Sequence, residues 1–289
     1  MTLDRPEQQI DSDGGAVVWG NVRVARDFVG RDQHKHYYLT QVTPVFMPRP
    51  AARDEARQPY PGPQPFRAND HDILTGRGPK TSDVLNQIRD EATQATVVLG
   101  PPDVGKTSFL AAGVLAKLDG VGADVFPMRD YGDAVSLLRG LLLGRAMEMG
   151  LAVSDQHPVP ELARAIVAAS PRRMVWVFDQ FERFFLQDVG TRERDALQEV
   201  LAQTIQELPP DRFQLLVGIR DDWQSALDRR WGDWLPGLRR SPVFLEPLGR
   251  SQARVAILHP TQKLGVQPIF DEAFLDEQLL DDLARLSPD

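Results

Sequence analysis

The chain has 289 residues, of which 42% are hydrophobic, so it can bury one substantial core and carry small additional parts. Its formal net charge of −8 argues against a general nucleic-acid-binding protein, which needs a basic surface, and the absence of cysteine excludes disulfides and thiolate metal sites. Because no apolar run is long enough to cross a bilayer and the polar N-terminus is unlike a secretory signal, we expect a soluble, cytoplasmic protein that does not bind membranes.

The N-terminal part differs in composition from the rest of the chain. Residues 1–45 contain short Val-rich pieces punctuated by Gly, Asn and Asp, and the alternation in "NVRVA" predicts either a small β-rich arm or a weakly ordered segment. Residues 46–68 are rich in proline, which blocks both helices and strand ladders. We therefore expect an extended linker over 46–68 and a domain boundary at its end.

From residue 69 onward, apolar runs alternate with amphipathic helical patterns. Strands that are buried on both faces read as continuous apolar runs, and their alternation with helices predicts a parallel sheet covered by helices on both sides. The sequence thus indicates an α/β domain over 69–248. The expected strands are 95–99, 123–128, 174–178, 213–219 and 242–246.

Residues 249–289 have a helical pattern and are predicted to form a helical subdomain. We expect it to be truncated, because its apolar residues need a partner and the chain stops soon after them. The residues expected to form one apolar stripe are Phe270, Phe274, Leu279, Leu283 and Leu286.

The segment "GPPDVGKT" at 100–107 matches the pattern G-x-x-x-x-G-K-[ST], with a strand pattern before it and a helical pattern after it. Glycines let the backbone wrap tightly, so that successive N–H groups face an anion. Asp103 is unfavourable beside phosphate unless its side chain points outward. The loop residues expected to surround the phosphates are Gly100, Pro102, Asp103, Val104 and Gly105.

The helix that follows the loop carries three polar side chains with distinct expected roles. Its partially positive N-terminus favours an anion. Lys106 is expected to reach the β- and γ-phosphates, Thr107 to bind Mg²⁺ and Ser108 to donate to the α-phosphate. The sequence therefore predicts a nucleotide-binding P-loop.

A second signal is "MVWVFDQFERFF", a buried-strand pattern that ends in Asp179. A carboxylate there lies at the carboxyl edge of the sheet, where open α/β sheets bind their ligands. Asp179 is therefore a candidate Mg²⁺ ligand opposite Thr107. Glu182, three residues further on, is a candidate for orienting the attacking water, with a solvated surface acid as the alternative.

A third strand pattern opens the segment "LLVGIRDDW", and Arg220 is the first charged residue after its apolar part. A guanidinium at this edge can contact a γ-phosphate with two hydrogen bonds and report whether it is present. The alternative is a surface arginine paired with Asp221 or Asp222.

Four segments occur in an order that resembles one known family: "PYPGPQPFRANDHDILTGR", "VVLGPPDVGKTSFLAAGVL", "VWVFDQFERFF" and "LLVGIRDDW". Together they resemble bacterial STAND NTPases (signal-transducing ATPases with numerous domains). The similarity is to the novel STAND subgroup with an FxGR motif and a DQFEE Walker B motif, and it covers about residues 59–289.

The resemblance implies a topology and further site residues. In that family the five-stranded parallel sheet has the additional-strand order 5-1-4-3-2, which would aim Arg220 at the γ-phosphate. Gly76 and Arg77 would lie near the base and ribose, and Pro260 would contribute to the adenine pocket from the helical subdomain. The implied cofactors are ATP or ADP with Mg²⁺, whereas the P-loop itself does not distinguish ATP from GTP.

The same resemblance implies a role and partners. Members switch between ADP-bound closed monomers and ATP-bound oligomers, with a sensor and a fused or associated effector, and many act in prokaryotic defence and cell death. We therefore expect a signal-transducing switch with a protein partner or fused domain and a nucleotide-dependent homo-oligomer. Two departures stand out: Arg183 replaces the second acid of DQFEE, and Gly78 replaces the usual acid after "GR". They predict slow hydrolysis or binding with little turnover.

Two other functions remain open at the level of sequence. The first is an AAA+-like loader or remodelling ATPase, because "GPPDVGKT" resembles "GPPGTGKT", although "DQFE" lacks the adjacent Asp-Glu usual in that family. The second is a non-catalytic interaction module in which nucleotide only stabilises the fold.

Overall fold

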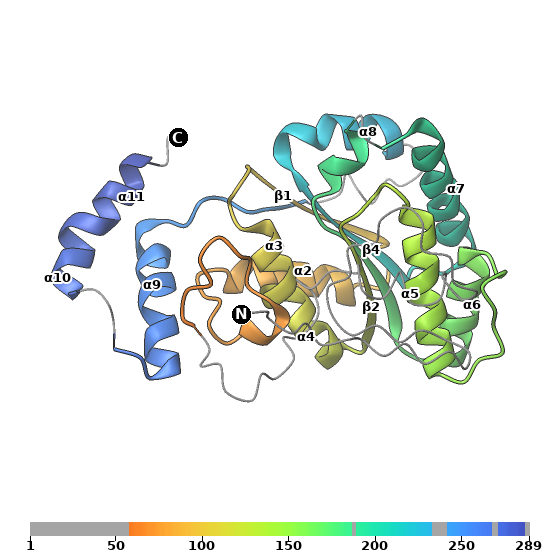
Figure 1. Cartoon of the computed structure of the whole chain (residues 1–289), viewed down its shortest axis with the longest axis horizontal. Coiled ribbons are helices and arrows are strands. Elements are labelled where there is room, and N and C mark those ends of the chain that lie inside the picture. The colour runs from red at the N-terminus through yellow and green to blue at the C-terminus, as the bar shows by residue number, and fades with distance from the viewer. Residues whose placement is uncertain (1–57, 187–188, 233–241, 268–270, 287–289) are drawn as a thin grey trace, which may run out of the picture.

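The computed structural model describes residues 58–186, 189–232, 242–267 and 271–286, and these form a sheet-centred domain followed by a smaller group of helices (Figure 1). The β-rich arm expected over 1–45 and most of the linker expected over 46–68 lie outside the described residues. Within the described residues, no helix is both long and apolar enough to span a bilayer.

A five-stranded sheet organises the larger part, and all its pairings are parallel. The strand order is β2-β3-β4-β1-β5, which confirms the predicted order 5-1-4-3-2. The last strand is shorter than expected, because Pro242 and Pro247 flank it and lack the N–H group that a ladder needs. The strands are β1 (Ala95–Gly100), β2 (Ala123–Met128), β3 (Arg173–Phe178), β4 (Phe213–Arg220) and β5 (Val243–Phe244).

Helices connect the strands and cover both faces of the sheet, as the continuous apolar strand patterns predict. One helical run follows the phosphate loop, and its middle turns have π-helical geometry. In chain order the helices are η1 (Ala68–Asp70), α2 (Gly78–Arg89), α3 (Lys106–Ser108), η2 (Phe109–Leu115), α4 (Ala116–Leu118), η3 (Asp119–Val121), α5 (Ala134–Glu148), α6 (Val159–Ala169), η4 (Phe181–Phe185), α7 (Thr191–Glu207), η5 (Asp221–Trp223), α8 (Gln224–Trp231), α9 (Arg250–Leu264), α10 (Glu272–Phe274), η7 (Leu275–Leu279) and α11 (Leu280–Leu286).

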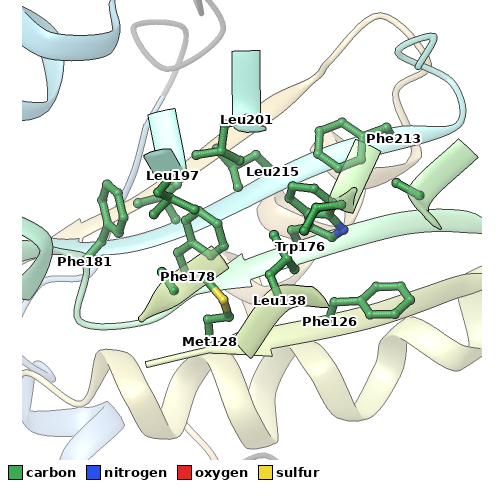
Figure 2. Packing of buried hydrophobic residues seen from close by; sticks show 14 of the residues in the cluster. Phe126, Met128, Leu138, Trp176, Phe178, Phe181, Leu197, Leu201, Phe213 and Leu215 are labelled. Atoms are coloured by element: carbon green, nitrogen blue, oxygen red, sulfur yellow. The ribbon is translucent and has the colours of Figure 1, made fainter. Parts of the chain in front are cut away.

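Two hydrophobic clusters lie on opposite faces of the sheet, because successive strand side chains point to opposite sides. Trp176 and Phe178 of β3 pack with residues of α5, α6 and α7, and Figure 2 shows them beside Leu138 of α5 and Leu197 of α7. Val175 and Val177 of the same strand belong to the cluster that includes α2 and η2. The sheet is therefore clamped between two helical layers, which fixes the position of its carboxyl edge.

The helices α9, α10 and α11 lie apart from the sheet (Figure 1) and have a small core of their own, formed by Leu258, Leu275 and Leu280. Of the expected apolar stripe, Leu279 packs against this core, whereas the side chains of Phe274 and Leu283 lie outside it and are 42% and 41% exposed. The core instead uses Leu275 and Leu280, because the π-helical geometry over Leu275–Leu279 brings these two residues, which are five apart, onto one face. Phe270 and the side chain of Leu286 lie outside what the structure describes.

Candidate nucleotide-binding site

Parallel strands end at one edge of the sheet, and the candidate site residues follow these ends. The phosphate loop follows β1, Asp179 follows β3, and Arg220 is the last residue of β4. Gly100 pairs in register with Arg220, and Phe178 pairs with Val217 of β4. The sheet thus gathers at one edge three of the groups that the sequence predicts for the site.

The backbone of the loop explains its glycines. Gly105 has a φ of 90°, which favours glycine, and it precedes the first residue of α3. A Cβ on Gly100 would lie 2.6 Å from the backbone oxygen of Leu245, so the approach of the chain after β5 requires glycine there. Asp103 is exposed and has a φ of 59°, while Pro102 is exposed beside it. An exposed Asp103 is compatible with a phosphate in the loop, because its carboxylate is in contact with solvent.

Lys106 is folded back onto the loop that precedes it. Its side-chain Nζ donates to the carbonyl oxygens of Gly100 and Pro101, at 2.8 Å and 2.7 Å, and the residue is only 8% exposed. Burial lowers the pKa of this ammonium group, and the carboxylates of Glu182, Asp221 and Asp179 oppose that shift. The Lys106 ammonium is thus held inside the loop, and three acids that follow the neighbouring strands act on it electrostatically.

Thr107 and Asp179 are in direct contact. The hydroxyl of Thr107 donates to Oδ2 of Asp179 at 2.9 Å, and the Nε of Arg129 forms an ion pair with the same oxygen at 3.0 Å. Asp179 is fully buried, and burial raises the pKa of its carboxyl group, while Arg129 and then Thr107 oppose the shift. The sheet register sets this arrangement, because the Asp179 N–H donates to the carbonyl of Met128, the residue before Arg129.

These residues fit a magnesium ion. Hydroxyl and carboxylate oxygens are the ligands that Mg²⁺ prefers, and neighbouring ligands in an octahedral shell lie about 3.0 Å apart when each is about 2.1 Å from the ion. The observed Thr107 to Asp179 distance of 2.9 Å matches this spacing. The oxygen that makes this contact is Oδ2, while the other oxygen, Oδ1, is buried without a side-chain partner within the described residues.

Glu182 and Arg220 meet through the Glu182 carboxylate and the Arg220 backbone, and the Arg220 guanidinium takes no part in this contact. Gln180, with a φ of 55°, turns the chain after Asp179 into η4, which carries Glu182. The N–H of Arg220 donates to Oε2 of Glu182 at 3.3 Å. The Arg220 guanidinium instead pairs with both oxygens of Asp222, at 3.0 Å and 2.5 Å, as in the alternative considered for it. Its role as a phosphate sensor stays a prediction.

The segment before α2 contacts both the phosphate loop and the helix α3 that follows it. Arg77 donates to the carbonyl oxygen of Val104 at 2.8 Å and to that of Glu246 at 2.6 Å. The N–H of Phe66 donates to the hydroxyl oxygen of Ser108 at 3.2 Å, which leaves the hydroxyl hydrogen free to donate elsewhere. Arg77 thus ties the phosphate loop to the chain that leads into α9.

The two remaining predicted residues lie where the same segment meets α9. Gly76 has a φ of 79°, and a Cβ there would lie 3.2 Å from Leu248 and 3.4 Å from the Gln252 carbonyl oxygen. Pro260 is buried within α9. Their predicted contacts with a base or ribose stay predictions.

Comparisons with known proteins identify the family. Residues 59–288 match the model of the family described as Novel STAND NTPase 1. The chain belongs to this family. Its members are P-loop NTPases, and membership implies nucleotide binding, typically with Mg²⁺. A comparison with curated proteins found no match.

The novel STAND NTPase also resembles solved structures at the level of fold. Two are of the ORC2 protein of Aeropyrum pernix: one with ADPNP and ADP (13% identity, TM-score 0.46, covering 64% of this chain and 50% of that chain) and one in the ADP form (13%, 0.45, 72% and 55%). A third is the ORC1 protein of Aeropyrum pernix in complex with DNA (17%, 0.43, 66% and 50%). The chain spans about half the length of each.

Sequence reasoning missed residues of this STAND NTPase that touch the site. Arg129 directly follows β2, just as Asp179 directly follows β3, so its place after an apolar run was an available signal. Asp221 follows β4 and acts on Lys106 electrostatically. Tyr131 is fully buried and donates its hydroxyl to the carbonyl of Asp179 at 2.8 Å, a contact that the sequence does not signal.

Tyr131 gives the STAND NTPase a testable pH dependence. Burial, assisted by Asp179 and Glu182, raises the pKa of this phenol well above its usual value. Its stabilising effect is therefore complete below about pH 10, the unfolded pKa, and is lost as the pH rises towards the folded pKa. We expect Tyr131→Phe to cost about 1 kcal/mol at pH 8, from the lost hydrogen bond. Above pH 10 the free energy of unfolding of the wild type should fall with pH more steeply than that of Tyr131→Phe, by about 1.4 kcal/mol per pH unit.

Urea unfolding at pH 8 and at several values above pH 10 measures this difference. Tyr60→Phe is the comparison, because Tyr60 is only half-buried and its pKa is raised less. If the free energy of unfolding falls with pH equally in the wild type and Tyr131→Phe above pH 10, the pKa of the Tyr131 phenol is not raised and the prediction is wrong.

Proposed function

We propose that this protein is an ATP-dependent molecular switch of the STAND type, with slow, Mg²⁺-dependent hydrolysis. The observation that carries the proposal is Arg77, which bonds to the phosphate loop at Val104 and to the chain after β5 at Glu246. A nucleotide that moves the loop would thereby act on the segment that leads into α9. The family resemblance supports a role for the switch in signalling for prokaryotic defence or programmed cell death.

Contacts continue from this segment to α9. His259 of α9 donates to the carbonyl oxygen of Asp72 at 3.0 Å, and the Tyr60 hydroxyl donates to the carbonyl of Ile257. Ion pairs in turn join α9 to the helices that follow it. Arg250 pairs with Asp281 of α11, and Arg254 pairs with Glu272 of α10 and Asp276 of η7. The helical subdomain is therefore joined to the phosphate loop through a short series of polar contacts that can break and form again.

The chain's own groups account for binding. Lys106 is placed to exchange its bonds to Gly100 and Pro101 for bonds to the β- and γ-phosphates, and the Ser108 hydroxyl to donate to the α-phosphate. Thr107 and Asp179 would hold Mg²⁺, which would neutralise phosphate charge. The assignment to ATP rests on the family resemblance, with Gly76, Arg77 and Pro260 near the base.

The predicted hydrolysis is slow for three reasons. Glu182, which would orient the attacking water, already accepts a hydrogen bond from the Arg220 backbone, and Arg183 is exposed where related motifs carry a second acid. The side chain of Arg220 must also leave Asp222 before it can contact a γ-phosphate. These three features favour a long-lived nucleotide-bound state, which suits a switch better than a motor.

Arg77→Ala tests whether the nucleotide reaches α9. In the wild type we expect ATP and ADP to give different hydrogen-exchange protection in α9, with a larger mass by light scattering in ATP. In Arg77→Ala the protein should still bind nucleotide, but the difference in α9 should fall by at least half, because the link between Val104 and Glu246 is gone. Arg89→Ala, an exposed position at the end of α2, is the matched control.

The same measurements also distinguish a switch from the two alternative functions, an interaction module and a remodelling ATPase. Identical protection and mass in wild type with ATP, with ADP and without nucleotide would refute the switch and leave a nucleotide-stabilised interaction module. Nucleotide-dependent rings whose ATPase activity rises with DNA or a client protein would instead indicate a remodelling ATPase.

A further inference from the structure

Arg129 is a cation at the carboxylate that the proposed metal site requires. It follows β2 directly, and its Nε lies 3.0 Å from Oδ2 of Asp179. The same Oδ2 accepts the hydrogen bond from Thr107 at 2.9 Å. The guanidinium therefore shares the one oxygen that joins the two proposed Mg²⁺ ligands.

The pairing of β2 with β3 fixes the backbone position of Arg129. Met128 pairs in register with Phe178, and the N–H of Asp179 donates to the carbonyl of Met128 at 2.9 Å. The residues that follow the two strands are thereby held side by side. The side chain of Asp179 is 1% exposed, and the side chain of Arg129 is 21% exposed. Asp179 is fixed in the interior, whereas Arg129 has an open side towards solvent.

A divalent ion at Thr107 and Asp179 would compete with Arg129. Two cations that approach one carboxylate oxygen repel each other, and the repulsion is strong where little water screens it. Asp179 is held by its strand, so the group that can yield is Arg129. In a protein without a bound metal, the same guanidinium balances a buried carboxylate that would otherwise be costly.

We propose that Arg129 is a built-in counterion for Asp179, and that its guanidinium and Mg²⁺ bind this carboxylate in alternation as Mg–nucleotide binds and leaves. The inference rests on the proposed nucleotide site and adds a positioning residue to it. Arg129 thus sets how strongly nucleotide affinity depends on Mg²⁺, because each Mg²⁺ that binds must first displace an ion pair.

Arg129→Met tests this alternation, since it keeps the length of the side chain and removes its charge. The measured quantity is the ratio of Kd for a fluorescent ADP analogue in EDTA to its Kd in Mg²⁺. If the ion pair opposes the metal, this ratio should rise by about tenfold in Arg129→Met and stay near the wild-type value in Arg129→Lys. A residue that only held the fold together would change stability and leave the ratio unaltered.

Arg145→Met is the matched control. Arg145 pairs with Asp124 at 3.1 Å, and Asp124 is likewise almost buried, but it lies near the start of β2, away from the phosphate loop. We expect the Mg²⁺ ratio of Arg145→Met to equal that of the wild type. An unchanged or lowered ratio in Arg129→Met would overturn the alternation, since a lowered ratio would mean that Arg129 assists the metal.

A second measurement needs no loss-of-charge variant and so covers a failure of Arg129→Met to fold. The side-chain Nε–H signal of Arg129 in the wild type, assigned by its disappearance in Arg129→Lys, should exchange faster with water once Mg–ADP is added. A signal that stays equally protected would refute the displacement. A wild-type protein that binds no nucleotide at all would refute the proposed function and this inference together, whereas binding with an unchanged ratio and unchanged protection refutes only the inference.

Discussion

Replacing Lys106 with alanine is expected to weaken the binding of Mg–ATP and Mg–ADP by at least about a hundredfold. Hydrogen bonds to charged groups contribute about 1.5 to 3 kcal/mol each, and the ammonium is placed to make two or more of them to phosphate oxygens. Its Nζ is already desolvated and held 2.8 Å from the Gly100 carbonyl oxygen. A group positioned in advance loses little freedom when it binds, so its removal should cost most of this energy.

Titration calorimetry with each nucleotide measures the loss, and thermal unfolding shows whether the variant is folded. Lys117→Ala is the control, because Lys117 lies in the same helical run at an exposed position of α4. Its nucleotide affinity should stay within about twofold of the wild type, since an exposed charge that far from the loop is screened by salt. Wild-type affinity in folded Lys106→Ala would remove the phosphate loop from the explanation of binding.

The fold could be predicted from the sequence because the strands are buried on both faces. Continuous apolar runs such as that of β3 have few other interpretations when helical patterns separate them. The order of the strands, by contrast, came from the family resemblance, since composition and periodicity do not state which strands are neighbours. The core of the helical subdomain was not predicted, because a π-helical turn brings Leu275 and Leu280 onto one face and no residue pattern signals such a turn.

The candidate site was predictable in position and less so in contacts. Asp179 could be placed next to Thr107 because a strand end and a loop pattern fix the backbone of both residues. The partner of Arg220 could not be chosen, because a long exposed side chain selects among nearby acids by rotamer, and Asp222 is the partner in this structure. Arg129 carries the same positional signal as Asp179, but no motif surrounds it.

Asp179→Asn is expected to abolish the effect of Mg²⁺ on nucleotide binding and to slow ATP hydrolysis by at least about a hundredfold. The amide keeps the shape of the carboxylate but loses its charge, and the metal contributes several kcal/mol to the transition state of phosphoryl transfer. The hydroxyl of Thr107 would remain, yet one neutral oxygen is a weak site for a hard divalent ion. Binding of ADP in EDTA should change little, because Lys106 and the loop are untouched.

Asp124→Asn separates this effect from a general loss of charge inside the sheet. Asp124 is a nearly buried acid of β2 that pairs with Arg145 and Arg172, as Asp179 pairs with Arg129. We expect Asp124→Asn to lower stability by about 2 kcal/mol, because Arg145 and Arg172 lose their nearly buried partner and keep only the carboxylates of Glu148 and Asp119, and to leave the Mg²⁺ ratio unchanged. Asp179→Asn and Arg129→Met should move that ratio in opposite directions, since the first removes the ligand and the second removes its competitor. If both lower the ratio, Arg129 supports the metal site; if neither changes it, Mg²⁺ binds elsewhere and Thr107 and Asp179 form only a structural contact.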